Sequence, residues 1–144
     1  DRSAVLDAIA DGTVDCISTD HAPHSQEEKS RPLAETPNGI IGLQTSLPLG
    51  VTELVRDGVV SLGRLIELMS AAPSRIIGIG PAVIAEGAAA DLTVFDPDES
   101  YVFTEDMIRS RSHNSPFIGR KLYGAVKMTF LRGEAVWREN GFKA

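Results

Sequence analysis

The sequence predicts an α/β fold with a helical first half and a β-rich second half. Apolar residues recur at helical spacing in three segments, at about residues 2–10, 42–58 and 61–70. The stretch 13–19 is apolar or small on both faces, which is typical of a buried strand in a parallel sheet. An alternating segment at 126–137 predicts a β-hairpin. Helices and a buried parallel strand therefore come first, and antiparallel strands follow.

The helical segments have recognisable ends. Gly12 and Gly58 follow the first two segments as stop signals, and Ser61 is placed to cap the third. Pro48 lies inside the second segment, where we expect it to kink or locally break the helix. A short helix or turn is expected at 72–80.

The second half begins at about residue 80, where short extended pieces replace the helical periodicity. We expect a strand at 91–95 closed by Pro97, a short extended piece at 101–104, and one or two helical turns after it. In the hairpin, Arg132-Gly133 supplies the turn.

Composition and charge exclude several classes of function. The chain has 144 residues, with 14 Lys and Arg against 20 Asp and Glu, a net charge of −6, and no basic cluster suited to nucleic acid. No apolar stretch approaches the roughly 20 residues needed to span a bilayer. The single cysteine, Cys16, indicates a reducing compartment. These observations predict a cytoplasmic protein without nucleic-acid or membrane partners.

A crowded turn follows the predicted strand at 13–19. The sequence STDHAPH places Asp20, His21 and His24 within five positions, directly after the strand end where α/β enzymes gather reactive groups. Asp20 is suited to ligate a metal or to accept a proton, or it caps the next turn. His21 fits a structural role better than ligation, and His24 either binds an anionic substrate or is a solvated loop residue.

Four segments in order carry a resemblance to a known family. They are STDHAPH, PNGIIGLQTSLPL, ADLTVFDPD and SRSHNSPFIGRKLYGAVKMTFLRGEAVW. Together they resemble the C-terminal third of bacterial class I dihydroorotases, which are metal-dependent amidohydrolases. The resemblance runs from Asp1 to Trp137. Hydantoinases and allantoinases share the Asp-His pair, but their following loops usually differ.

The resemblance implies a particular fold and domain division. Residues 1–80 would be the C-terminal portion of a (β/α)8 TIM barrel: the last helix, the last strand, a lid loop at 21–39 and closing helices. Residues 81–144 would be part of a flanking β-sandwich. We therefore expect the chain to be a segment of a longer enzyme, inactive when produced alone.

The resemblance also implies site residues. Asp20 matches the aspartate that ends the eighth barrel strand, binds the catalytic zinc and acts as general base and then general acid. His24 matches the histidine that contacts the substrate carboxylate, and Asn38 and Gly39 match a loop pair whose backbone touches the substrate. The family often has Phe before that glycine, so Asn38 is a departure. The implied reaction is the reversible, zinc-dependent cyclisation of N-carbamoyl-L-aspartate to dihydroorotate in pyrimidine biosynthesis.

Most of the implied metal centre is not in this sequence. The family binds one or two Zn²⁺ ions largely through a His-x-His and further histidines upstream, whereas this chain has only His21, His24 and His113. The implied partners are therefore the N-terminal remainder of the barrel, and a second copy of the enzyme or an aspartate transcarbamoylase. Two alternatives stay open: a non-catalytic dihydroorotase-like scaffold subunit of a transcarbamoylase complex, and another cyclic amidohydrolase such as a hydantoinase or allantoinase.

Overall fold

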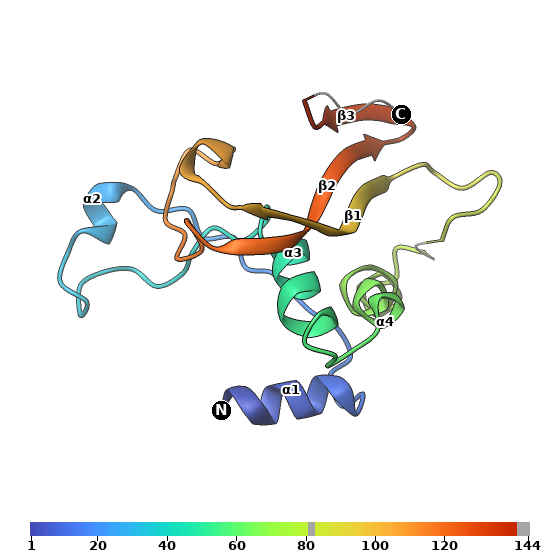
Figure 1. Cartoon of the computed structure of the whole chain (residues 1–144), viewed down its shortest axis with the longest axis horizontal. Helices are drawn as coiled ribbons and strands as arrows, with labels where there is room; N and C mark the ends of the chain where they lie inside the picture. The colour runs from blue at the N-terminus through green and yellow to red at the C-terminus, as the bar shows by residue number, and fades with distance from the viewer. Residues whose placement is uncertain (81–82, 141–144) are drawn as a thin grey trace.

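The computed structural model describes residues 1–80 and 83–140. The sheet has three strands, and Figure 1 shows it on one side of a group of helices, with the long loop that carries the short helix at 26–29 extending away from both. The first helix, α1 (Arg2–Ala10), matches the sequence prediction and lies farthest from the sheet. The division into 1–80 and 81–144 stays a prediction, and residues 81 and 82 of its second part lie outside the described residues, as do 141–144.

The predicted strand at 13–19 is wrong as an assigned strand. The segment has neither helix nor strand structure, and no described strand lies beside it. A strand is a paired state, because its backbone groups need a neighbouring strand as hydrogen-bond partner. Here Val14 donates its N–H to Ala8 O at 3.0 Å and Ile17 to Leu68 O at 2.9 Å, and both side chains pack on the helical core.

The second predicted helix begins later than its apolar pattern. It comprises α3 (Ser46–Gly50) and a π-helical continuation, η1 (Val51–Val55). The expected kink at Pro48 was wrong, because this residue is the third of the helix. An N–H at that position has no acceptor within the helix, so proline removes no hydrogen bond there.

The third predicted helix is longer than expected. It runs without interruption through α4 (Leu62–Ile66), the π-helical η2 (Glu67–Ala71) and α5 (Ala72–Ile77), so the separate short helix expected at 72–80 is its last turns. The predicted cap is confirmed, because Ser61 Oγ accepts the Arg64 N–H at 3.2 Å. Gly78, with φ 72°, ends the helix in the left-handed conformation.

The sheet is antiparallel in the order β1-β2-β3, formed by β1 (Leu92–Val102), β2 (Lys121–Leu131) and β3 (Glu134–Arg138). The predicted hairpin is confirmed: positive φ angles of 52° at Arg132 and 85° at Gly133 suit a tight two-residue turn. Strand β1 joins the two extended pieces expected separately, and a register shift between Asp96 and Ser100 accommodates Pro97. A 3-10 turn, η3 (Glu105–Met107), follows β1.

Two apolar clusters support these elements. The helical cluster comprises Ile9, Val51, Leu54, Leu65 and Leu68. The second cluster lies where the long loop meets the sheet, and it comprises Ile41, Phe103, Ile108 and Leu122. Gly124 of β2 joins the two layers, because a Cβ there would come within 2.9 Å of Val51 Cγ2. The long loop is therefore anchored at its base on a buried cluster.

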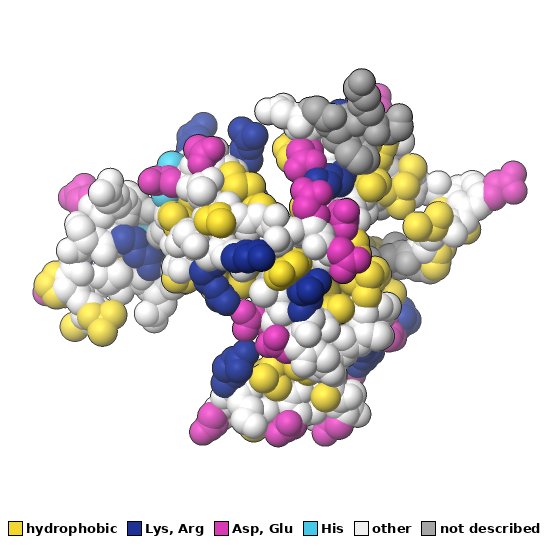
Figure 2. Space-filling model, viewed as in Figure 1, with side chains coloured by type: hydrophobic (Ala, Val, Ile, Leu, Met, Phe, Trp, Pro, Cys, Tyr) yellow, Lys and Arg dark blue, Asp and Glu magenta, His cyan; other side chains and the backbone are white. Residues whose placement is uncertain are grey.

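Acidic and basic side chains are interspersed over the face shown in Figure 2, which carries no large patch of basic side chains. Within residues 1–80 and 83–140, no helix has the length and apolarity needed to cross a membrane.

Candidate active site

Asp20 lies at the end of the irregular segment, before the long loop. Gly42 packs directly against its backbone, because a Cβ on Gly42 would collide with Asp20 O. The Asp20 side chain is exposed, and it makes no hydrogen bond or ion pair with any residue that the structure describes. Its carboxylate is therefore available to a ligand from outside this part of the chain.

His21 has a structural contact. Its Nδ1 accepts the Gly42 N–H at 3.2 Å, which ties the start of the loop to its end. Because Nδ1 is the acceptor, the neutral ring carries its proton on Nε2. This contact agrees with the structural role that the sequence favoured for His21.

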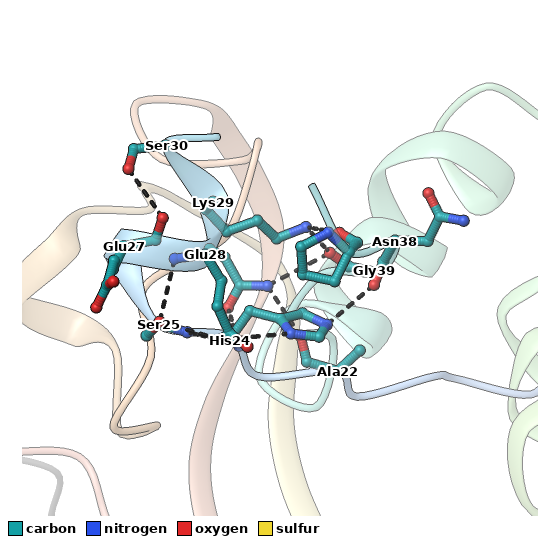
Figure 3. A network of polar contacts seen from close by, with 11 residues as sticks. Ala22, His24, Ser25, Glu27, Glu28, Lys29, Ser30, Asn38 and Gly39 are labelled. Carbon is teal, nitrogen blue, oxygen red and sulfur yellow. Dashed lines mark hydrogen bonds and ion pairs between the residues drawn. The ribbon is translucent and has the colours of Figure 1, made fainter. Parts of the chain in front are cut away.

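His24 is held by three other segments (Figure 3). Its Nε2 donates to Asn38 O at 3.0 Å, and since a carbonyl oxygen can only accept, the proton must be on Nε2. Its backbone N–H donates to Asn114 Oδ1 at 3.3 Å, and its Nδ1 lies 3.9 Å from Glu28 Oε2. The side chain keeps 22% of its surface exposed, so the ring is held in place but remains reachable.

Asn38 and Gly39 lie directly against His24, as expected for a common site. The Asn38 side chain extends away from the network in Figure 3, and only its carbonyl faces the imidazole. Gly39 has φ 102°, and a Cβ at this position would overlap Ala22 Cβ. Glycine is required here on both counts, since L-residues rarely adopt this φ and no space exists for a side chain.

Lys29 and Asn114 complete the arrangement, and sequence reasoning missed both. Lys29 Nζ donates to Pro37 O at 2.8 Å and to Gly39 O at 2.7 Å. Asn114 Nδ2 donates to Ala22 O at 2.9 Å and to Gly39 O at 3.4 Å. We call the set Ala22, His24, Lys29, Asn38, Gly39 and Asn114 the loop junction.

Only one of these two residues had a signal in the sequence. Asn114 begins the segment NSPFIGRKLYG, which carries part of the resemblance, so that segment could have directed attention to it. Lys29 ends the charged run QEEK, which reads as a solvated surface.

A short helix inside the loop directs Lys29. Helix α2 (Gln26–Lys29) begins with a reciprocal cap, in which Ser25 Oγ accepts the Glu28 N–H at 3.2 Å and the Glu28 carboxylate accepts the Ser25 N–H at 2.8 Å. The N–H and the hydroxyl of Ser25 together lower the pKa of Glu28 below its ordinary value of 4.5. The cap orders the turn from which Lys29 reaches back to the loop.

Two hollows mark the surface, and only the smaller one borders the candidate residues. A hollow of about 620 Å³ lies between α3 and the sheet and includes Tyr101 and Trp137, but none of Asp20, His24, Asn38 or Gly39. The smaller hollow, of about 460 Å³, is lined by His24, Lys29 and residues 111–114. The larger hollow therefore does not coincide with the candidate residues, whereas the smaller one borders the loop junction.

The described residues do not form a metal centre by themselves. No group of three or more His, Cys, Asp or Glu side chains is placed to hold a metal ion in residues 1–80 and 83–140. Asp20 is available as one ligand, but a catalytic zinc site takes about three protein ligands. The arrangement at hand is one free carboxylate beside an ordered polar loop.

The sequence matches known proteins over most of its length. The Amidohydrolase family matches residues 1–136. The chain belongs to the amidohydrolase family. It is 42% identical to a dihydroorotase from Clostridium acetobutylicum over 96% of this chain and 33% of the relative, and 50% identical to one from Desulfotalea psychrophila over 92% and 31%. The chain thus spans about a third of the length of the relatives it matches.

Solved structures of hydantoinases have the same fold. A D-hydantoinase (dihydropyrimidinase) from a Thermus species matches with a TM-score of 0.88 and 26% identity, over 99% of this chain and 32% of that one. An L-hydantoinase from Arthrobacter aurescens matches with a TM-score of 0.85 and 30% identity, over 97% and 32%. These enzymes are TIM-barrel amidohydrolases, so the predicted α/β fold, as a segment of such a barrel enzyme, is confirmed. The resemblance to bacterial dihydroorotases is also confirmed.

Proposed function

We propose that the protein containing this chain is a dihydroorotase, which closes N-carbamoyl-L-aspartate to dihydroorotate reversibly in pyrimidine biosynthesis. The observation that carries the proposal is the identity of 42–50% to dihydroorotases over more than nine-tenths of the chain. The hydantoinases share the fold at 26–30% identity, which makes hydantoinase activity the second candidate.

Asp20 is the proposed general base and metal ligand. Its carboxylate is exposed, free of partners among the described residues, and of a type that ligates zinc, so it fits that role. One or two zinc ions, held mainly by residues outside this chain, would polarise the ring amide and activate water. In the hydrolytic direction Asp20 would accept a proton from the attacking water and deliver it to the departing ring nitrogen.

His24 is the proposed contact of the substrate carboxylate, and the backbone of Asn38 and Gly39 is a second proposed contact of the substrate. The support is the geometry of the loop junction, which gathers these three residues although they are up to 15 positions apart in sequence. The Nε2–H of His24 already donates to an oxygen, Asn38 O. Binding would replace Asn38 O by an oxygen of the substrate carboxylate at this donor. The exchange is favourable because a charged acceptor makes a stronger hydrogen bond than a neutral carbonyl.

We propose that the remainder of the barrel covers an exposed apolar surface at the end of the helical half. Ile76, Ile77, Ile79 and Ile84 are 60%, 66%, 74% and 90% exposed. Exposed apolar surface of this kind marks an interface. We propose residues 1–80 as the barrel part and 81–144 as the sandwich part, and homodimerisation or association with an aspartate transcarbamoylase for the whole enzyme.

The test is a substrate comparison on the full-length protein. Purified enzyme is assayed with dihydroorotate, hydantoin and 5,6-dihydrouracil, before and after metal removal and after zinc is restored. We expect turnover of dihydroorotate that is lost with the metal and recovered with zinc. Preferential hydrolysis of hydantoin or dihydrouracil would replace the proposal by the second candidate. A metal-loaded protein inactive on all three would instead indicate the scaffold subunit.

A further inference from the structure

Lys29 has a contact pattern unusual for a surface lysine. Its ammonium is partly buried and donates to two backbone carbonyls of the same loop, Pro37 O at 2.8 Å and Gly39 O at 2.7 Å. Hydrogen bonds from a charged donor are about twice as strong as neutral ones. In the described residues Lys29 makes no ion pair, so its charge is directed at these peptide groups alone.

The two carbonyls lie on either side of the peptide that meets His24. The Asn38–Gly39 peptide contributes the oxygen that accepts from His24 Nε2, and Lys29 holds the peptide before it and the peptide after it. All peptides here are trans, so the N–H groups of Asn38 and Ile40 point away from the ammonium. One side chain therefore sets the orientation of the backbone on both sides of the His24 contact.

Asn114 cannot replace this function. Its side-chain amide reaches Gly39 O only at 3.4 Å and makes its shorter contact, of 2.9 Å, to Ala22 O. Among the described residues, Pro37 O has no donor other than Lys29. Loss of the Lys29 ammonium thus frees the 37–38 peptide entirely and leaves Gly39 with one long hydrogen bond.

We propose that Lys29 is a positioning residue, which acts on the substrate through the backbone of residues 37–39 and through His24. It does not touch the substrate itself. The effect on the substrate depends on the proposed function, whereas the hold of Lys29 on the loop does not. The test therefore needs one measurement of each.

The experiment compares three variants of the full-length protein. Lys29→Met removes the charge and both hydrogen bonds at similar length, and Lys29→Arg keeps a cationic donor. Arg31→Met is the matched control, because it removes a positive charge from the same loop and the Arg31 side chain makes no hydrogen bond in the described residues. Only the backbone oxygen of Arg31 accepts one, from Thr36 Oγ1 at 2.7 Å, and the substitution keeps it.

The first measurement is hydrogen exchange, which needs no activity. The Ala22 and Ile41 amides are bonded to Ile40 O at 2.9 Å and Asn114 O at 3.2 Å, so release of the loop exposes both. Lys29→Met should accelerate their exchange about tenfold or more, and Lys29→Arg and Arg31→Met should stay near wild type. Wild-type exchange in Lys29→Met would refute the hold on the loop.

The second measurement is the split between KM and kcat, on whichever cyclic amide the wild type hydrolyses. Lys29→Met should raise KM roughly tenfold or more while kcat stays within about threefold, since the lost interaction positions a binding surface. Faster exchange with unchanged KM would make Lys29 purely structural and overturn the proposal. A wild type that hydrolyses hydantoin but not dihydroorotate would refute the proposed function, and the KM shift would still decide the role of Lys29.

Discussion

Asp20 and His24 stand four positions apart in one short stretch, yet their surroundings differ completely. The Asp20 carboxylate is exposed and makes no contact among the described residues. The His24 backbone and ring contact Asn38, Asn114 and Glu28, and its ring is 22% exposed. The two residues divide the candidate site into a side that this chain orders by itself and a side that it leaves free.

The difference shows which part of the candidate site can be completed by the residues of this chain. The loop junction needs only imidazole, amide, ammonium and carbonyl groups, all of which this chain supplies. A metal centre needs several ligands that converge on one point, and a carboxylate on a segment without strand partners supplies one. This chain therefore orders the His24 side by itself, whereas a metal centre at Asp20 needs ligands from outside the described residues.

Replacing Asp20 by Asn in the full-length protein should have the largest effect. Asn keeps the shape but removes the base and the negative ligand charge, so kcat should fall by about 10²–10⁴. Steady-state kinetics checks this. Asp15→Asn, on the same segment and also exposed, is the control and should stay near wild type. A kcat within tenfold of wild type would show that the free side of the comparison is not catalytic.

Replacing His24 by Ala should weaken binding of dihydroorotate and of the product-like inhibitor orotate. A lost hydrogen bond to a charged group corresponds to about 1.5–3 kcal/mol, or roughly ten- to a hundredfold in Kd. Titration calorimetry and metal analysis together check the result, with zinc content expected to be unchanged. Loss of zinc with unchanged affinity for orotate would instead show that His24 is a metal ligand, like the role proposed for Asp20.

Removing the cap of α2 should have the smallest effect. Ser25→Ala deletes the acceptor of the Glu28 N–H, which corresponds to about 1 kcal/mol of local stability. Hydrogen exchange of the α2 amides measures the change.

The effect of Ser25→Ala should depend on pH in a defined direction. Hydrogen bonds from Ser25 lower the folded-state pKa of Glu28 below 4.5, so its contribution is present above 4.5 and is lost as pH falls through the lowered value. The difference from wild type should therefore narrow as the pH falls below 4.5 and through the lowered pKa of Glu28. A difference that grows on acidification would contradict the capping account.

The sequence predicted those parts of the fold that depend on residues close together in the chain. Helix α1, the cap at Ser61 and the hairpin turn at Arg132-Gly133 follow from neighbours within a few positions, and the structure confirms them. The strand at 13–19 was predicted from composition alone, which gives the environment that a strand prefers but not its hydrogen-bond partner. Pro48 was misread because the helix begins at Ser46, later than the apolar pattern, which places the proline in the first turn.

The candidate site was predicted in part for the same reason. His24, Asn38 and Gly39 came from the resemblance, and the structure brings them together, although their roles stay predictions. Lys29 could not be found, because its partners are backbone carbonyls and any residue type supplies a carbonyl. Long-range contacts between a side chain and the backbone leave no period in a sequence.

The contact between His24 and Asn114 also determines when the loop junction can form during translation. The two residues are 90 positions apart, so His24 has been made long before its partner exists. At roughly 5–20 residues per second, the ribosome needs about 5–18 seconds to cover that distance. During this interval Lys29 can already bond to the loop, but the contacts of Asn114 with His24 and Ala22 cannot form. The loop junction is therefore complete only after Asn114 has been made.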